Sequence, residues 1–101
     1  MDKVVIDSQI DQPDELFLEM KLRQSLSTFG NRLQFVRLIL RMKSEPGYPG
    51  LYYRCDLEGR SSEMETAVGS AQHIDIAMAI ERAAQKLRCN LSLRNDKSLN
   101  L

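Results

Sequence analysis

Basic side chains at helical and strand spacing are the residues of this sequence best suited to chemistry, and that chemistry is the binding of phosphate. Arg82 and Lys86 lie one turn apart in an amphipathic segment, outside its apolar stripe, and Arg88 lies on the flank. Arg37 and Arg41 alternate with apolar residues, so they share one face of a predicted strand. Such cations neutralise phosphates and release counterions. The candidate nucleic-acid contacts are Lys21, Arg82, Lys86, Arg88, Arg37 and Arg41.

The distribution of charge along the chain supports local patches rather than a generally basic protein. The formal net charge is zero, from 14 basic and 14 acidic residues. Residues 1–19 contain six acids and one base, whereas residues 20–43 contain six bases and no acid. A polyanion responds to such patches more than to the total charge. The zero total nevertheless argues against strong non-specific binding of nucleic acid.

Four of these six bases also have a simpler interpretation. Asp56 and Glu58 alternate on a neighbouring predicted strand, and they are candidate cross-strand partners for Arg37 and Arg41. Arg82 and Lys86 have the pattern of ordinary solvated helix residues. Both interpretations remain open at the level of sequence.

The sequence offers little for catalysis or metal binding. It has one histidine, His73, near a predicted helix start, where a capping or surface role is expected. Cys55 and Cys89 are far apart in sequence and fit two reduced thiols better than a disulfide framework. There is no glycine-rich phosphate loop and no nucleophile motif. We therefore expect no enzyme activity, no cofactor, no metal site and no small-molecule substrate.

The periodicity of apolar residues predicts two helices and four strands. Residues 3–8 are rich in β-branched side chains and are predicted to form a strand. Pro13 opens a predicted helix that ends at Gly30-Asn31. The apolar stripe of this helix consists of Leu18, Leu22, Leu26 and Phe29, with Leu16 and Met20 beside it. Residues 34–43 and 51–58 alternate as strands around a loop at 44–50, a turn begins at 59–60, and residues 63–69 form a weaker strand. The last helix begins at Asp75, and its buried stripe is Ile76, Ile80, Ala83, Ala84, Leu87 and Leu91. Met78 and Cys89 fall on its wet side.

The order β-α-β-β-β-α predicts an α+β fold, a two-layer sandwich with both helices on one face of a four-stranded mixed sheet. The helical crossover should make the first two strands parallel. We expect one domain over residues 1–93 and a flexible polar tail at 94–101. The start of the sequence lacks the apolar run of a signal peptide, and no stretch approaches the roughly 18 apolar residues of a membrane span. A cytoplasmic protein is expected.

The last helix resembles the C-terminal helix of the ribosome-hibernation family, which includes the hibernation-promoting factors and ribosome-associated inhibitors once labelled sigma-factor modulators. That helix typically reads Asp-hydrophobic-Tyr-x-Ala-Ile-Asp, followed by a Lys-Leu pair and a final Leu. The matching residues here are Asp75, Ala79, Ile80, Glu81, Lys86, Leu87 and Leu91. The strand at 64–68, the first helix and the corner at 31–33 are also similar, so the resemblance covers nearly the whole chain.

The resemblance implies a protein that binds the small ribosomal subunit near the decoding region, through ribosomal RNA. Family members occupy space that messenger and transfer RNA would use, and so hold idle ribosomes inactive during stress. They use no cofactor. The resemblance thus implies occlusion without chemistry, with Arg82, Lys86 and Lys21 on backbone phosphates.

The sequence departs from the family pattern at several positions, and the departures define two alternatives. Ala77 replaces the tyrosine of the helix motif, and the outward lysines of the first helix are replaced by Gln24, Ser25, Ser27 and Thr28. A protein-interaction module on the same fold, with little affinity for RNA, is therefore the alternative function. Self-association through Phe35 and Ile39 on the outer face of the sheet is a third possibility.

Overall fold

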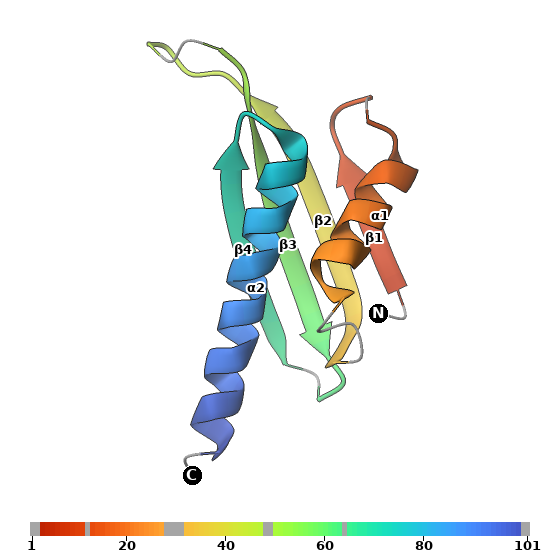
Figure 1. The fold of residues 1–101 in the computed structure, drawn as a ribbon, viewed down its shortest axis with the longest axis vertical. Coiled ribbons are helices and arrows are strands. Elements are labelled where there is room, and N and C mark those ends of the chain that lie inside the picture. Colours follow the sequence, from red (N-terminus) through yellow and green to blue (C-terminus); the bar gives the residue numbers. More distant parts are fainter. Residues whose placement is uncertain (1–2, 12, 28–31, 48–49, 64, 100–101) are drawn as a thin grey trace.

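The computed structural model describes residues 3–11, 13–27, 32–47, 50–63 and 65–99, and for 92–99 it describes the backbone alone. Two helices and four strands follow one another in the order that the periodicity predicts (Figure 1). Their bounds are β1 Lys3–Ser8, α1 Glu15–Ser25, β2 Leu33–Lys43, β3 Tyr52–Ser61, β4 Thr66–His73 and α2 Ile76–Leu99.

The four strands form one mixed sheet in the spatial order β1-β2-β3-β4. β1 pairs with β2 in parallel, while β2–β3 and β3–β4 are antiparallel. Both helices lie on one face of this sheet, and the other face is uncovered (Figure 1). The helix α2 packs on β3 and β4, and α1 packs on β1 and α2. The predicted α+β sandwich and the predicted parallel pair are therefore confirmed.

The core lies between the helices and the inner face of the sheet, and it is mostly aliphatic. The stripes predicted for both helices supply one side of it, and the inward residues of the strands supply the other. Fully buried side chains include Leu18, Leu22, Leu26, Val36, Leu38, Leu40, Cys55, Leu57, Ile80 and Leu87. Phe29 and the Gly30-Asn31 stop lie outside the described residues. Leu16 and Met20 are 66% and 64% exposed, so the buried stripe of α1 is narrower than the sequence suggested.

Each helix begins after an aspartate that caps it. Asp14 accepts a hydrogen bond from the backbone N–H of Phe17 at 3.0 Å, so α1 begins one residue after the cap rather than at Pro13. Asp75 accepts from the N–H of Ala77 at 2.8 Å, as its position before α2 predicts. Such caps satisfy backbone donors that have no partner inside the helix.

The hairpin between β3 and β4 lies further along the chain than predicted. β3 continues through Gly59 and Arg60 to Ser61, and β4 runs over Thr66–His73 rather than 63–69. The sequence predicts that Gly59 begins a turn, but this residue faces the core, where an added Cβ would lie 3.1 Å from Leu33 Cδ2. Its lack of a side chain serves packing here and not chain reversal.

Gly69 of β4 permits the closest approach between the two layers. A Cβ at this position would lie 2.4 Å from the carbonyl oxygen of Ala83 and 2.6 Å from the backbone nitrogen of Leu87. The backbone of α2 therefore lies directly against β4. The same helix continues to Leu99, through the residues expected to begin a flexible tail at 94.

Candidate nucleic-acid interface

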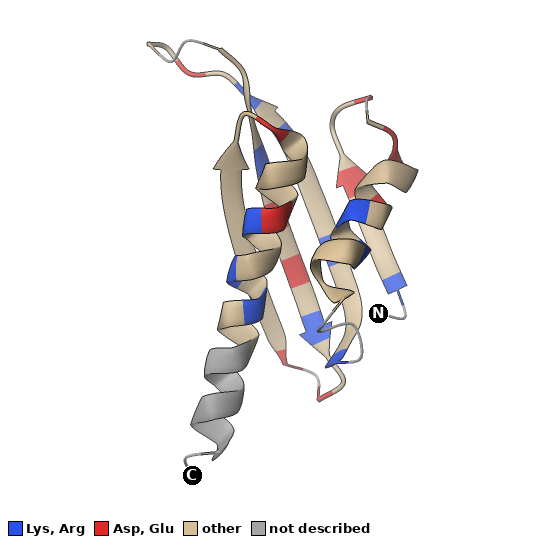
Figure 2. Ribbon diagram, in the orientation of Figure 1, with Lys and Arg blue, Asp and Glu red and all other residues tan. Residues whose placement is uncertain are grey.

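The six predicted contacts are divided between the two layers of the sandwich. Arg82 and Lys86 are exposed on α2, and Arg88 is half-buried on the same helix. Arg37 and Arg41 lie on β2 and face away from the helices. Figure 2 shows basic residues on both helices and on several strands, interspersed with acidic ones. The candidates therefore do not form one patch.

Arg82 and Lys86 are the candidates most available to a ligand. The described residues offer no ion pair to either side chain. Lys21 differs, because its Nζ lies 3.8 Å from a carboxylate oxygen of Glu81 and its side chain is only 22% exposed. This ion pair joins α1 to α2. Lys21 is thus less free to contact a phosphate than the sequence alone suggested.

The outer face of the sheet carries a local excess of positive charge. The pairing register of the strands places the outward residues of this face in rows, and one row runs from Arg41 through Arg54 to Gln72. The outward cations are Lys3, Arg37, Arg41, Lys43, Arg54 and Arg60, and the outward carboxylates are Asp7, Asp56 and Glu58. Phe35 lies beneath the guanidinium of Arg60, 5.9 Å from ring centre to Cζ.

The ion pairs expected on this face are formed differently. Arg37 lies opposite Glu58 in the register, yet its ion pair at 3.4 Å is with Asp7 of β1. Arg41 lies opposite Arg54, another cation, and no ion pair joins it to a described residue. In the described residues no ion pair joins Asp56 or Glu58 to Arg37 or Arg41, although Glu58 lies opposite Arg37 in the register and the charge of Arg41 lowers the pKa of Asp56. The two-residue alternation gives the face of each side chain but not the register between strands.

Asp56 is instead the centre of a small network with Arg54 and Ser70. It accepts a hydrogen bond from Arg54 Nε at 3.1 Å and one from the Ser70 hydroxyl at 2.5 Å. Burial alone would raise the pKa of Asp56, but the bonds from Ser70 and Arg54 and the charges of Arg54 and Arg41 together hold it below its ordinary value. The bond to Asp56 raises the pKa of Arg54. The carboxylate therefore stays charged and fixes the guanidinium beside it.

Arg54 is a site residue that the sequence did not single out. It lines a hollow of about 270 Å³ together with Ser70, Ala71, Gln72 and Lys86. Lys86 comes from α2 and the other residues come from the sheet, so the hollow joins the two layers at the edge strand β4. Arg54 alternates with apolar residues on the same strand face as Asp56, and nothing in the sequence placed Lys86 near them.

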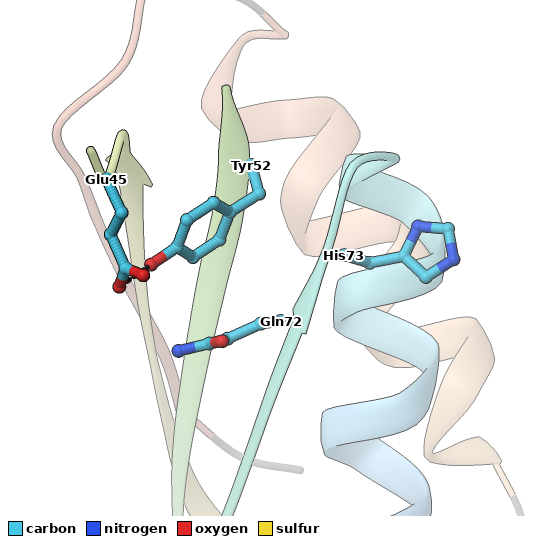
Figure 3. Close-up of a pocket in the computed structure, with 4 residues that line it drawn as sticks. All are labelled: Glu45, Tyr52, Gln72 and His73. Atoms are coloured by element: carbon cyan, nitrogen blue, oxygen red, sulfur yellow. Dashed lines mark hydrogen bonds between the residues drawn. The ribbon is translucent and has the colours of Figure 1, made fainter. Parts of the chain in front are cut away.

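A second hollow, of about 220 Å³, lies at the base of the β2–β3 hairpin and is lined by Glu45, Tyr52, Gln72 and His73. The hydroxyl of Tyr52 donates to Glu45, across the ends of β2 and β3. Figure 3 shows the ring of His73 pointing away from the other three side chains. His73 Nδ1 accepts the N–H of Asp75 at 2.9 Å, which is the capping role expected of it. The hydroxyl of Tyr52 is therefore partnered by Glu45, and the ring of His73 is turned away from this pair.

Comparison with known proteins assigns no family to this chain. No protein-family model matches the chain, and no curated protein matches it. In the described residues, no group of three or more His, Cys, Asp or Glu side chains is placed to hold a metal ion. Both cysteines are free, Cys55 buried and Cys89 exposed. None of the described helices combines the length and the apolar character needed to cross a membrane.

Proposed function

We propose that this chain is a ribosome-binding domain that inhibits translation by occupying the decoding region of the small subunit, in contact with ribosomal RNA. The observation that carries the proposal is the pair Arg82 and Lys86, which are exposed one turn apart on α2 without an ion pair to any described residue. The similarity of this helix to the hibernation family supports it. In this proposal the protein acts by filling space and performs no chemistry.

The electrostatics of the chain fit a binder of RNA backbone with a modest, salt-dependent affinity. Folded RNA is recognised mainly through its shape and its phosphates. Each cation that contacts a phosphate releases counterions, so affinity falls as salt rises. Because the net charge is zero, the protein needs a surface on which cations locally outnumber acids. The exposed side of α2 and the outer face of the sheet both meet this condition.

Co-sedimentation with purified small ribosomal subunits at low and moderate salt tests the proposal. We expect binding at low salt that weakens as salt is added, and a loss of roughly tenfold or more in the double variant Arg82→Gln, Lys86→Gln. The control is Arg23→Gln with Arg32→Gln, which removes the same charge from two exposed positions, one on α1 and one just before β2. Absence of binding at both salts would sink the proposal. Equal weakening by test and control would show that α2 is not the contact.

A second candidate, a protein-interaction module, is favoured by an exposed apolar group on α1. Leu16, Phe17 and Met20 are 66%, 43% and 64% exposed. Leu16 and Met20 lie one turn apart, and an exposed apolar cluster on a helix is a common feature of a protein contact. This candidate predicts a partner whose capture survives nuclease and high salt and is lost in the variant Leu16→Gln, Met20→Gln. Capture that disappears on nuclease treatment would exclude it.

A further inference from the structure

The hollow at the edge of β4 brings together cations from elements that are distant in sequence. Lys86 approaches it from α2, and Arg54 approaches it from β3 across the face of β4. Ser70 and Gln72 of β4 supply a hydroxyl and an amide to its lining. Its volume of about 270 Å³ is large enough for one phosphate group with water.

Arg54 is held so that part of its guanidinium remains available. Its Nε donates to both carboxylate oxygens of Asp56, at 3.1 and 3.3 Å. Asp56 is fixed in turn by the hydroxyl of Ser70. The two terminal nitrogens of Arg54 have no acceptor among the described residues. They form the fork with which arginine binds two oxygens of a phosphate.

Arg41 adds a third cation beside this group. It is the Cα partner of Arg54, on the same face, and its Nε is buried without a hydrogen-bond partner in the described part of the chain. A buried donor without an acceptor costs free energy, and so do two like charges opposite each other. Asp56 offsets one of the three cations and leaves two net positive charges. Arg41 does not itself line the hollow and its Nε is inaccessible, so an anion bound at Arg54 would reduce the repulsion between the two arginines without giving that Nε a partner.

We infer that this hollow binds a phosphate group of RNA, with the terminal nitrogens of Arg54 donating to two phosphate oxygens and Lys86 adding an ionic contact. The inference rests on the proposed function, which supplies the RNA. It extends the contact surface from Arg82 and Lys86 on α2 around the edge of β4 and onto the outer face of the sheet. Asp56 and Ser70 are positioning residues, since they act through Arg54.

Titration of the labelled protein with inorganic phosphate, followed by nuclear magnetic resonance, tests the site directly. We expect saturable shifts at the Arg54 Nε–H and the Gln72 side-chain amide. In Arg54→Lys the charge is kept but the fork is lost, so affinity should fall by roughly tenfold, nearly as far as in Arg54→Gln. The controls are Arg23→Lys and Arg23→Gln, which should change nothing. Shifts that do not saturate, or full binding by Arg54→Lys, would overturn the inference.

Two further measurements keep the test independent of folding and of the proposed function. Lys86 is exposed, so Lys86→Gln should fold normally and still weaken phosphate binding; unchanged binding would contradict the site.

In the second measurement, small ribosomal subunits are added to wild type and to Arg54→Lys. Weaker binding by the variant supports the inference. If wild type binds and the variant binds equally, the inference fails while the proposed function stands. If phosphate binds but no subunits do, the ribosomal RNA of the small subunit is excluded as the source of the phosphate, and the inference fails together with the proposed function.

Discussion

Arg41 of β2 and Arg54 of β3 lie directly opposite each other in the antiparallel pair, with both side chains on the uncovered face of the sheet. Like charges in this position destabilise a sheet. Their situations differ, because Arg54 is hydrogen-bonded to Asp56 whereas the Nε of Arg41 is buried without a partner in the described residues. The pair therefore allows the cost of placing two cations opposite each other on this face to be measured one residue at a time.

Replacement of Arg41 and replacement of Arg54 should change the free energy of unfolding in opposite directions. We expect Arg41→Gln to raise the free energy of unfolding by about 0.5 kcal/mol at low salt, because it removes the repulsion from Arg54 and the buried Nε without a described partner, which together outweigh the lost attraction to Asp56. Arg54→Gln should lower it by up to about 1 kcal/mol, since it takes a donor from Asp56. Urea denaturation at low and high salt measures both effects. A loss of stability in both variants would show that the repulsion is negligible, and the gain in Arg41→Gln should shrink as salt screens it.

Asp56 should contribute stability that depends on pH. Its pKa is lowered in the folded state, so the unfolded chain binds a proton more readily. The contribution is therefore fully present above the ordinary carboxyl value of about 4 and is lost as the pH falls through the folded pKa. Asp56→Asn should be less stable than wild type at neutral pH, with the difference shrinking in acid. Denaturation curves across this range provide the measurement, and a constant difference would contradict the network.

Gly69 should be the glycine least tolerant of a side chain. In Gly69→Ala the new methyl group meets backbone atoms of Ala83 and Leu87, which cannot move without shifting α2, so we expect a loss of about 3 kcal/mol or more. Gly59→Ala is the matched control, because its methyl would meet the ends of the Leu33 and Leu87 side chains, which can rotate. Thermal denaturation compares the two. Equal losses would mean that the helix and β4 are less closely packed than the structure indicates.

The capping residue Asp75 provides a separate test of where α2 begins. Asp75→Ala removes the acceptor for the N–H of Ala77 and should cost about 1 kcal/mol. Asp75→Asn retains a capping oxygen and should cost much less. Chemical denaturation of the two variants measures the difference. Similar losses for Ala and Asn would indicate that charge rather than hydrogen bonding matters here.

The two cysteines should differ in their reaction with a thiol reagent. Cys89 is exposed, while burial raises the pKa of the Cys55 thiol to about 12. The thiolate is the reactive form, so Cys55 should be protected at neutral pH. We expect Ellman's reagent to modify Cys89 in the native protein and both cysteines in denaturant. Cys89→Ser isolates Cys55, and rapid modification of that variant under native conditions would show that the core opens at β3.

The sequence by itself determined the order of the elements and the buried face of each. Helical spacing of Leu18 and Leu22 in α1 and of Ile80 and Leu87 in α2, and alternation around Leu38 in β2, are local patterns imposed by the geometry of helix and strand. The resemblance to the hibernation family, and the exposure of Arg82 and Lys86, came from the same local patterns.

Only the tertiary structure decided which side chains meet. Arg41 faces Arg54 because the β2–β3 hairpin sets a register that no period in the sequence reveals. Lys86 and Arg54 line the same hollow because α2 lies against β4, where Gly69 leaves room for its backbone. These contacts join residues far apart in the chain. They depend on strand register and on how closely the two layers approach, and neither quantity is encoded within a single element.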